Sequence, residues 1–415
     1  MRRVVVTGLG ALTPLGNNLH EYWEGLKNGV SGSVLITRFN TEKFKTKFAC
    51  ELKNYDSSKY FDRKEANKID LYSQYAMVST AEAIADSGLD LDVVDKDRVG
   101  VIWASGVGGI ETFYQAIKGY VEGDGTPRFS PFFIPKMIGD IAAGQISIKY
   151  GFRGPNFATV SACASSTNSI IDAVNYIRLG KADVFVSGGS EAAVNEPGIG
   201  GFNALQALST NNESYQTASR PFDKTRDGFV LGEGAGTLIL EEYEHAKARG
   251  AKIYAEIVGT GLTADAYHVT APHPEGTGAR NVMKLAIEEA GLKPEDVDYI
   301  NVHGTSTPLG DIAETKAILG VFGEHAYKLN ISSTKSMTGH LLGAAGAIEA
   351  IAAIMSVIHD IVPPTINFSV PDPEIDQNLN LTLNKAQKRK VNVALSNTFG
   401  FGGHNASVVI KKFES

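Results

Sequence analysis

The chain has 415 residues, of which 43% are hydrophobic and 20% are charged, and its formal net charge is −7. This composition excludes an intrinsically disordered chain and a small single module, and it provides enough apolar residues for a large core. The excess of acidic over basic residues argues against a broad nucleic-acid-binding surface.

The chain begins with a predicted strand at residues 4–6, in a short apolar segment that glycines and Pro14 interrupt. This segment lacks the small-residue cleavage pattern of a signal peptide. The most apolar later stretch, residues 341–362, carries Glu349 and Asp360, so it contains no uncharged run of the about 18 residues that a membrane helix needs. We therefore expect a soluble, cytoplasmic protein that binds neither membranes nor nucleic acids.

Short β-branched runs that end in glycine-rich turns alternate with helix-length segments, which predicts α/β layers around a buried, largely parallel sheet. The pattern occurs twice in one order, which indicates an ancient duplication with halves 1–250 and 251–415 around a continuous interior. Extra material at 28–91 and 110–153 lengthens the first half. Within it, the aromatic and proline-rich segment 129–135 is either a loop packed on the core or a wall for a partner subunit or substrate tunnel. The matched segments are 4–10 with 255–261, 99–106 with 298–305, 157–171 with 329–348, and 182–189 with 390–397.

Cys163 stands in a predicted elbow between a strand and a helix, whose apolar positions begin at Ile170. Unpaired backbone N–H groups and the helix dipole favour a thiolate at such a position. A lone cysteine in apolar surroundings is more often structural, so the cysteine alone leaves both interpretations open. With Cys50 as the only other cysteine, the sequence has neither a disulfide framework nor a cysteine-based zinc site.

Two histidines of the second half are candidate partners for Cys163. His303 follows the predicted strand 297–302, where open α/β sheets place ligand chemistry, and His340 lies in the turn that the duplication matches to that of Cys163. Each is either a buried structural histidine or part of one cleft with the cysteine. A cysteine protease needs only one histidine, whereas two neutral imidazoles that donate to one oxygen stabilise an enolate. The pattern therefore indicates carbon–carbon bond formation on a thioester.

Several motifs together cover the chain, and with them it resembles the elongating β-ketoacyl-[acyl-carrier-protein] synthases over essentially its whole length. The resemblance implies a thiolase-like α-β-α-β-α five-layered sandwich built from two duplicated halves, and a homodimer. The motifs are the Cys163 elbow, His303-Gly-Thr-Ser-Thr, Lys335-Ser-Met-Thr-Gly-His340, Arg220-Pro-Phe-Asp-Lys-Thr-Arg-Asp-Gly-Phe with Gly232-Glu-Gly-Ala-Gly, and Gly400-Phe-Gly-Gly.

The resemblance also implies a reaction in fatty acid elongation that requires no cofactor. Cys163 takes an acyl chain from acyl carrier protein, malonyl carrier protein loses carbon dioxide, and the carbanion attacks the acyl thioester to give a 3-oxoacyl carrier protein. Backbone N–H groups of Cys163 and Phe401 form the oxyanion hole. His303 and His340 hold the malonyl thioester oxygen as the enolate develops.

The remaining roles come from the same resemblance. A buried pair supports the histidines, threonines contact the phosphopantetheine arm, two apolar residues line the acyl pocket, the loop around Phe401 opens and closes, a basic cluster docks the carrier, and four residues match a monovalent-cation site. Asn67 and Gln206 stand where relatives often have arginine, and Arg128 is an alternative docking residue. The respective residues are Lys335 and Glu349; Thr305 and Thr307; Phe202 and Val107; Phe401 with its hinge glycines Gly400, Gly402 and Gly403; Arg63, Lys64 and Lys68; and Asn301, Glu349, Ser396 and Asn397. Thr270, Phe399 and Gly400 are further expected to bind substrate.

Other classes fit the sequence less well. A thiolase needs a second cysteine near its C-terminal loop, but the only candidate is Cys50, and an initiating synthase has asparagine in place of His340. The glycines between Gly8 and Gly16 do not have dinucleotide-binding spacing, and Pro14 disfavours the helix that such a motif opens. Two alternatives stay open: a ketosynthase of a polyketide or specialised-lipid pathway, and a non-catalytic thiolase-like scaffold.

Overall fold

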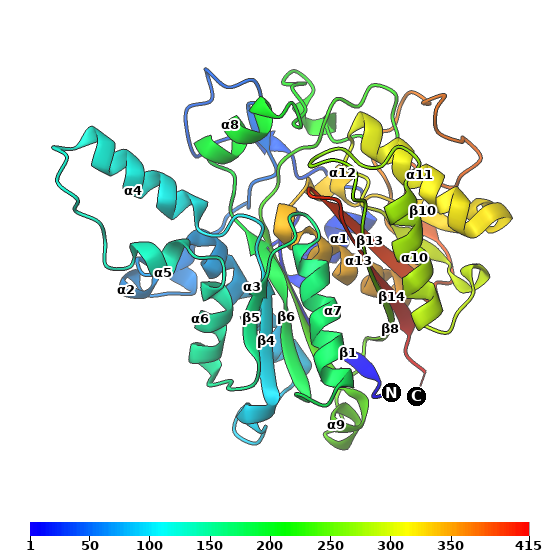
Figure 1. The fold of residues 1–415 in the computed structure, drawn as a ribbon, viewed down its shortest axis with the longest axis horizontal. Coiled ribbons are helices and arrows are strands. Elements are labelled where there is room, and N and C mark those ends of the chain that lie inside the picture. The colour runs from blue at the N-terminus through cyan, green and yellow to red at the C-terminus, as the bar shows by residue number, and fades with distance from the viewer. Residues whose placement is uncertain (415) are drawn as a thin grey trace.

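The computed structural model describes residues 1–414 and has one main sheet of ten strands in the order β10-β9-β13-β14-β8-β1-β7-β6-β4-β5 (Figure 1). At its centre β1 and β8 pair through only two residue pairs, so the sheet divides into two five-stranded parts. The strands are β1 (Val4–Leu12), β4 (Val99–Ala104), β5 (Asn156–Thr159), β6 (Val184–Glu191) and β7 (Gly234–Glu242), then β8 (Ala255–Ala264), β9 (Tyr299–Asn301), β10 (Asn330–Ser332), β13 (Val393–Gly400) and β14 (His404–Lys412).

The two parts of the sheet have the same topology. From the outer edge inward, the first has β5, β4 and β6 parallel and then β7 and β1 antiparallel. The second repeats this order with β10, β9, β13, β14 and β8. Four of the five corresponding strand pairs are those that the sequence matched, and β7 with β14 is the fifth. The predicted repeat is confirmed, whereas the boundary at residue 250 stays a prediction.

Helices complete five layers. α7 (Ser165–Arg178) and α13 (Ala345–His359) contact strands of both halves and form the central layer, while α3 (Leu71–Ser87) covers the first half and α10 (Thr277–Glu289) covers the second. This arrangement confirms the predicted thiolase-like sandwich. The other helices are α1 (Leu19–Lys27), α2 (Arg63–Ala66), α4 (Ile110–Glu122), α5 (Phe133–Met137), α6 (Ile141–Tyr150), α8 (Glu196–Ala204), α9 (Tyr243–Ala248), α11 (Pro308–Phe322) and α12 (Lys335–Thr338), and the short strands are β2 (Val34–Leu35), β3 (Phe48–Ala49), β11 (Ile361–Val362) and β12 (Gln387–Lys388).

The central layer packs tightly because its helices carry small residues. At Gly346 a Cβ atom would lie 2.0 Å from the Thr167 hydroxyl, so only glycine allows α13 to approach α7 this closely. The stretch Leu342–His359 is long and apolar enough to cross a membrane, but 89% of it is buried inside the fold. This stretch therefore forms the core helix of the sandwich.

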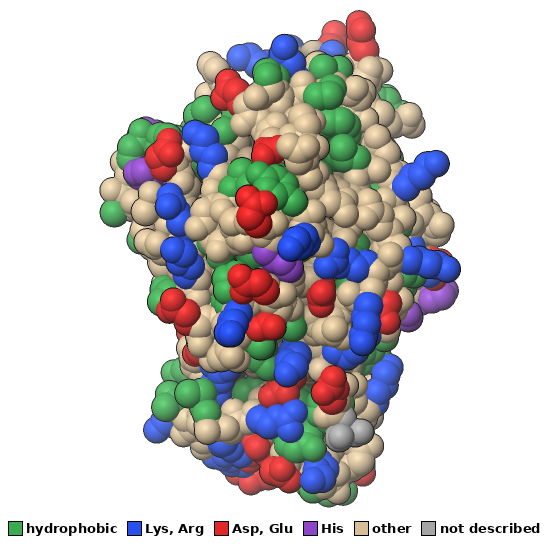
Figure 2. Space-filling model, turned by 90° about the vertical axis from the view of Figure 1, so that its right-hand side faces the viewer, with side chains coloured by type: hydrophobic (Ala, Val, Ile, Leu, Met, Phe, Trp, Pro, Cys, Tyr) green, Lys and Arg blue, Asp and Glu red, His purple; other side chains and the backbone are tan. Residues whose placement is uncertain are grey.

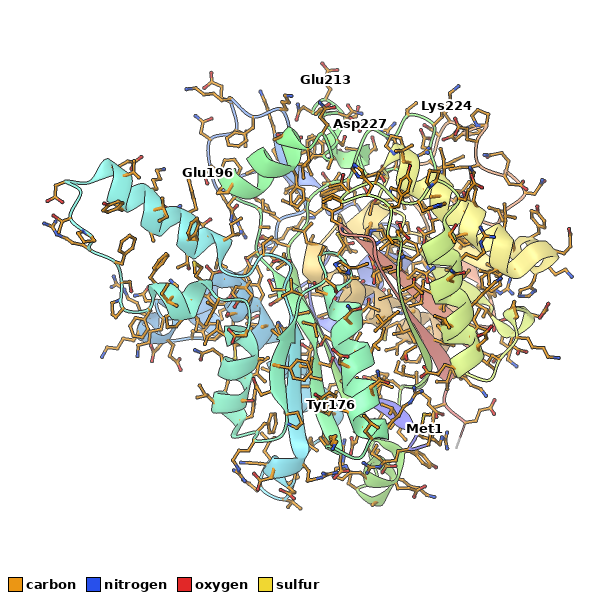
Figure 3. The ribbon with its side chains drawn as sticks, viewed as in Figure 1. Met1, Tyr176, Glu196, Glu213, Lys224 and Asp227 are labelled. Carbon is orange, nitrogen blue, oxygen red and sulfur yellow. The ribbon has the colours of Figure 1, made fainter. Side chains whose placement is uncertain are left out.

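The insert at 110–153 forms a flap, which consists of α4, α5 and the loop between them and projects from the body of the molecule (Figure 1). Tyr114 of α4 donates a 3.2 Å hydrogen bond to Glu196 of α8, which Figure 3 labels. Of the two interpretations of segment 129–135, packing on the core is wrong, because its apolar side chains remain exposed. The exposed apolar residues of the flap include Phe113, Tyr120, Val121, Phe129, Phe132 and Ile134.

Candidate active site

The nucleophile candidate lies at the start of a central helix. The chain leaves β5, turns at Ala162 with φ of +50°, and enters α7 at Ser165, so that Cys163 lies at the N-terminal end of that helix. The Ser165 hydroxyl accepts a 2.8 Å hydrogen bond from the Ser161 N–H and donates a 2.6 Å bond to the Ala162 carbonyl. These bonds hold a non-glycine residue in a left-handed conformation, as occurs at functional turns.

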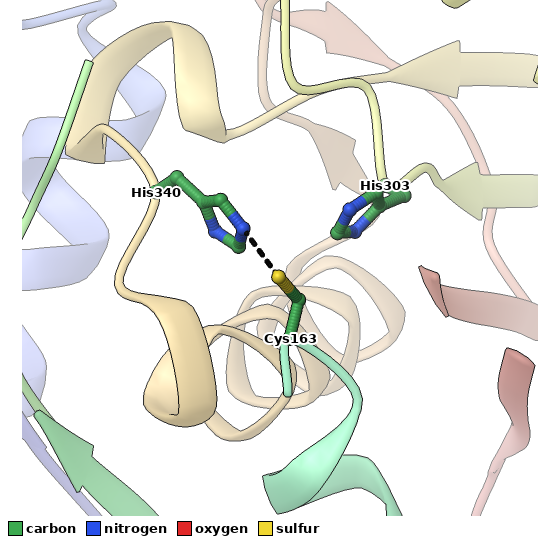
Figure 4. A group of neighbouring side chains, drawn as sticks. All are labelled: Cys163, His303 and His340. Carbon is green, nitrogen blue, oxygen red and sulfur yellow. Dashed lines mark hydrogen bonds between the residues drawn. The ribbon is translucent and has the colours of Figure 1, made fainter. Parts of the chain in front are cut away.

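Both predicted histidines converge on Cys163 from the other half of the chain (Figure 4). His340 Nε2 lies 3.0 Å from Cys163 Sγ. The rings of His303 and His340 have centroids 5.4 Å apart and are nearly perpendicular, at 88°. One ligand atom from each of the three residues lies within 4.8 Å of the other two, and all three residues are buried. The structure thus forms the cleft that the matched turns suggested.

The protonation states in this cleft follow from burial. Desolvation, with the charge of Lys335, lowers the pKa of both imidazoles well below the usual value, so both are neutral at pH 7. Desolvation also raises the pKa of the Cys163 thiol to about 11, although Lys335 and the Phe401 N–H act against it. Burial therefore opposes the thiolate that a helix N-terminus favours. A proton acceptor is needed, and His340 Nε2 is within reach.

Lys335 and Glu349 form a buried ion pair beside the histidines. Lys335 begins α12 and is 1% exposed, and its Nζ bonds to the carboxylate of Glu349 on α13. Burial raises the pKa of Glu349 to about 7 despite the ammonium group. A buried pair contributes little net stability once desolvation is counted, so its effect is mainly electrostatic.

Two carboxylates that the sequence analysis missed hold the His303 turn. Glu314 accepts hydrogen bonds of 2.9 Å from the His303 N–H and 2.8 Å from the Gly304 N–H. Asp311 accepts bonds from the Phe222 and Ser306 N–H groups at 2.9 and 3.2 Å. The signal for both was their i, i+3 spacing in an otherwise apolar helix directly after the histidine motif, which places two acidic groups on one buried face.

A cavity of about 420 Å³ connects the cleft to the surface. Asp227 lies at its mouth and is labelled in Figure 3. Val107 does not line this cavity and is 42% exposed, so the single chain does not form the predicted acyl-pocket wall there. The predicted residues that do line it are Cys163, Phe202, Thr270, His303, Thr305, Thr307, His340, Phe399, Gly400 and Phe401.

The loop between β13 and β14, residues 399–403, lies directly over the nucleophile; we call it the gating loop. A Cβ atom on Gly400 would lie 2.6 Å from the Ser161 carbonyl and 3.1 Å from the Cys163 nitrogen, so the loop can approach Cys163 only with glycine there. The Gly402 N–H donates a 2.6 Å hydrogen bond to the Val269 carbonyl. Gly402 has φ of +87°, a conformation that favours glycine.

Three buried oxygens near the ion pair have no hydrogen-bond partner among the described residues: Asn301 Oδ1, Glu349 Oε2 and Ser396 Oγ. Asn301 and Ser396 are register partners on β9 and β13, and α13 packs against both strands. Buried oxygens without donors suit a cation. The fourth predicted ligand, Asn397, differs, because its carbonyl oxygen accepts a 2.6 Å bond from Ser407.

The predicted docking residues Arg63, Lys64 and Lys68 are exposed at α2 and do not line the cavity. They lie beside the flap: Lys68 Nζ is 5.6 Å from the centroid of the Phe132 ring. On the face shown in Figure 2, basic and acidic side chains are interspersed rather than gathered into a patch of one sign.

The cluster of Cys163 with two histidines also has the composition of a metal site. The Nδ1 atoms of both rings are buried without a hydrogen-bond partner, whereas a ligating histidine almost always donates its second nitrogen to an acceptor. The ammonium group of Lys335 also opposes a cation, as its effect on both imidazoles shows. The donor set therefore fits acid–base chemistry better than metal binding.

Curated relatives match this chain over its whole length. The protein named 3-oxoacyl-[acyl-carrier-protein] synthase 2 of Staphylococcus aureus strain COL is 52% identical over 414 residues, which cover 100% of this chain and 99% of the relative. The protein of the same name from Synechocystis sp. is 48% identical over 413 residues, with the same coverage.

Solved structures and family models agree with these relatives. A β-ketoacyl synthase from Burkholderia phymatum STM815 is 36% identical with a TM-score of 0.93, and a type II polyketide ketosynthase solved with its acyl-carrier protein is 35% identical with a TM-score of 0.92. Each match covers 100% of both chains. The models for the N-terminal and C-terminal domains of β-ketoacyl synthases match residues 1–246 and 254–369. The chain therefore belongs to the β-ketoacyl synthase family.

Proposed function

We propose that this protein is an acyltransferase that condenses malonyl-acyl carrier protein, with loss of carbon dioxide, with an acyl chain held on Cys163. The product is a 3-oxoacyl-acyl carrier protein in fatty acid elongation. The observation that carries the proposal is the buried cleft in which His340 Nε2 lies 3.0 Å from Cys163 Sγ and His303 faces both. The full-length relatives at 48–52% identity, named as synthase 2, support the same reaction.

In the first stage the acyl chain moves to the cysteine. The Cys163 thiol, with its pKa raised to about 11, passes its proton toward His340 Nε2 as sulfur attacks the acyl thioester. The N–H groups of Cys163 and Phe401 face the developing oxyanion, and such donors supply much of the catalysis in acyl transfer. The carrier thiol leaves with a proton, and the acyl chain remains on Cys163.

In the second stage the malonyl group loses carbon dioxide. His340, which accepted a proton at Nε2 in the first stage, carries its proton on Nε2 in this stage, as the other neutral tautomer. The malonyl thioester oxygen accepts hydrogen bonds from the neutral His303 and His340 rings, and these bonds strengthen as the oxygen gains enolate charge in a water-poor cleft. The carbanion then attacks the acyl carbonyl on Cys163, and the carbon–sulfur bond breaks to return a thiolate, which takes up a proton. One carbon–carbon bond forms for each carbon dioxide released.

Acyl carrier protein is the proposed partner that delivers both substrates. Its phosphopantetheine arm fits the cavity at Thr270, Thr305 and Thr307, where the last two hydroxyls lie 3.0 Å apart and can bond to the amides of the arm. Docking at Arg63, Lys64 and Lys68 is proposed on charge complementarity with an acidic carrier.

A homodimer in the cytoplasm is proposed as the working form. Strand β5 ends the sheet and pairs only with β4 among the described strands, and the flap exposes apolar side chains such as Phe129 and Ile134. Unpaired strand edges and contiguous exposed apolar surface are typical of interfaces. A second copy that covers the flap would also cover the exposed Val107 and complete the acyl pocket.

The test separates the two stages. We expect Cys163→Ala to form no acyl-enzyme, whereas His303→Ala still acylates but releases no carbon dioxide from malonyl carrier protein. Intact-protein mass spectrometry and carbon dioxide release measure these steps, and His245→Ala, a histidine outside the cavity, serves as the matched control. If both active-site variants accumulate the same acyl-enzyme, the assigned roles are wrong.

We propose a monovalent cation at Asn301, Glu349 and Ser396. When bound, it would balance the free carboxylate oxygen of Glu349 and stiffen the contact between α13 and the sheet. We expect the melting temperature to be higher in potassium or sodium chloride than in choline chloride at equal ionic strength, and this difference to vanish in Ser396→Ala. Equal melting temperatures in all three salts would rule the site out.

A polyketide pathway is the second candidate, because one of the similar solved structures, at 35% identity, is a ketosynthase of a type II polyketide system. The higher identity of the synthase 2 relatives favours fatty acid elongation. Incubation with saturated acyl carriers of graded length distinguishes the two. An enzyme of fatty acid elongation should condense saturated chains across the series. A polyketide enzyme should instead require chains that keep their oxo groups.

A further inference from the structure

Glu191 is a buried carboxylate directly behind the active site that the mechanism above does not use. It ends β6 and is 0% exposed. Its two oxygens accept hydrogen bonds from the Ser105 hydroxyl at 2.8 Å and from the N–H groups of Gly106, Val107 and Gly343 at 2.7, 3.3 and 2.9 Å. All four donors are neutral, so the carboxylate is held without an ion pair.

The four donors belong to two turns, from opposite halves of the chain. The first turn follows β4 and includes Gly106 and Val107; the second follows His340 and includes Leu342 and Gly343. The turns touch at their glycines, because a Cβ atom on Gly343 would lie 2.2 Å from the Gly106 nitrogen. Glu191 therefore bonds to both turns at the point where they meet.

The second turn is strained and lines the cleft. Leu342 has φ of +47°, which is uncommon for a bulky residue, and its side chain lines the cavity that contains Cys163. A conformation of this kind persists only where the surroundings impose it. The bond from the Gly343 N–H to Glu191 is one such restraint, and it acts three residues after His340.

We propose that Glu191 is a positioning residue that holds the Val107 turn against the Leu342 turn and thereby sets the shape of the wall that receives the acyl chain. It acts through these turns and touches no substrate. The inference rests on the proposed function, since the wall matters only if Cys163 carries an acyl chain. Glu191 thereby influences which acyl chain lengths the site accepts, although it does not itself line the cavity.

The fold offers a matched control elsewhere. Glu82 also uses its carboxylate to accept two backbone N–H groups, from Ala11 at 2.8 Å and from Leu19 at 2.7 Å, and it does not line the cavity. Glu82→Gln and Glu191→Gln make the same chemical change. In each, an amide NH₂ replaces an oxygen that faced a donor, so one hydrogen bond becomes a contact between two donors.

The experiment measures acylation of Cys163 by acyl carriers of graded chain length, with intact-protein mass spectrometry, for the wild type and both variants. We expect Glu191→Gln to lower the rate for the longest accepted chains by about tenfold relative to the shortest, because a displaced wall affects only chains that reach it. Glu82→Gln should keep the wild-type length profile. Ser105→Ala, which removes one donor, should shift the profile in the same direction as Glu191→Gln but less.

Several outcomes would overturn the inference. An equal loss at every chain length in Glu191→Gln, or a shifted profile in Glu82→Gln, would leave Glu191 with a purely structural role. If Glu191→Gln does not fold, an unchanged profile in Ser105→Ala refutes the proposal. Failure of the proposed function looks different, because the wild type would then form no acyl-enzyme at any length.

Discussion

Lys335 affects the active site through its charge as well as through its bond to Glu349. Its ammonium group lowers the pKa of both His303 and His340 and acts against the raised pKa of Cys163. Decarboxylation needs the imidazoles neutral, because only a neutral ring can donate to the enolate oxygen and return unchanged. On the proposed mechanism, we therefore expect Lys335 to extend the active pH range downward.

Replacing this lysine provides a test. In Lys335→Met the pKa of both imidazoles rises toward the usual value, so the loss of malonyl decarboxylation on acidification should begin at higher pH than in the wild type. Glu349 can tolerate the loss of its partner by binding a proton, since its pKa is already raised to about 7. The shift is measured from the rates of carbon dioxide release between pH 5 and 8, which is roughly the range over which histidines titrate.

Lys412→Met is the control, because Lys412 forms a more exposed ion pair with Asp360 at 2.8 Å. If carbon dioxide release declines at the same acidic pH in Lys335→Met as in the wild type, the charge of Lys335 does not set the imidazole pKa values.

At the residue scale, motif and position predicted Cys163, His303 and His340, because the strand ends of the two repeats were visible in the sequence. The raised pKa of the Cys163 thiol was not predicted, since it depends on how deeply the folded chain buries the side chain. Glu314 and Glu191 were missed for a similar reason. Glu314 accepts bonds from backbone N–H groups, and Glu191 from backbone N–H groups and the Ser105 hydroxyl, so neither has a charged partner that a sequence pattern can reveal.

At the scale of elements, the gating loop owes its conformation to a few glycine positions. A Cβ atom on Gly402 would lie 2.9 Å from His404 Nε2, and its φ of +87° costs an alanine about 1–2 kcal/mol. We expect Gly402→Ala to lower the free energy of unfolding by about this amount. It should also slow acyl transfer, because the bond from the Gly402 N–H to the Val269 carbonyl is displaced.

Thermal melts and acylation rates together check this expectation. Gly291→Ala is the matched control, because Gly291 has φ of +66° and nothing lies within 4 Å of its Cβ position. Both variants should lose similar stability, while only Gly402→Ala loses acylation rate. Equal acylation rates in the two variants would contradict a gating role.

The strands were predictable as short apolar runs that end in glycine-rich turns. The expected largely parallel sheet is wrong, because the sheet is mixed: β1, β7, β8 and β14 pair only with antiparallel neighbours. The repeat identified four strands of each half, whereas the fifth strand of each half, β7 or β14, and the order and pairing of all five come from the structure. The flap was not predictable in the same way. Its aromatic residues have the composition of a core segment, and only the structure shows that Phe129 and Ile134 stay exposed.

At the scale of the whole molecule, the duplicated halves share one interior. The largest cluster of buried apolar residues joins Val4, Ile102 and Val174 of the first half with Ile351 and Val408 of the second. The candidate active site is shared too, because Cys163 comes from one half and both histidines come from the other. The halves are therefore related by ancestry, but we do not expect them to fold independently.

Fragments 1–250 and 251–415 test this expectation. Separated, each fragment exposes one face of the central layer, at a cost of roughly 25 cal/mol for every Å² of apolar surface left in water. We expect each alone to aggregate or to lack a cooperative thermal transition, and the two co-expressed fragments to assemble and regain acylation of Cys163. Circular dichroism melts and mass spectrometry measure these outcomes. A single fragment that melts cooperatively would contradict the shared interior, because it would show that α7 or α13 can bury its apolar surface without strands from the other half.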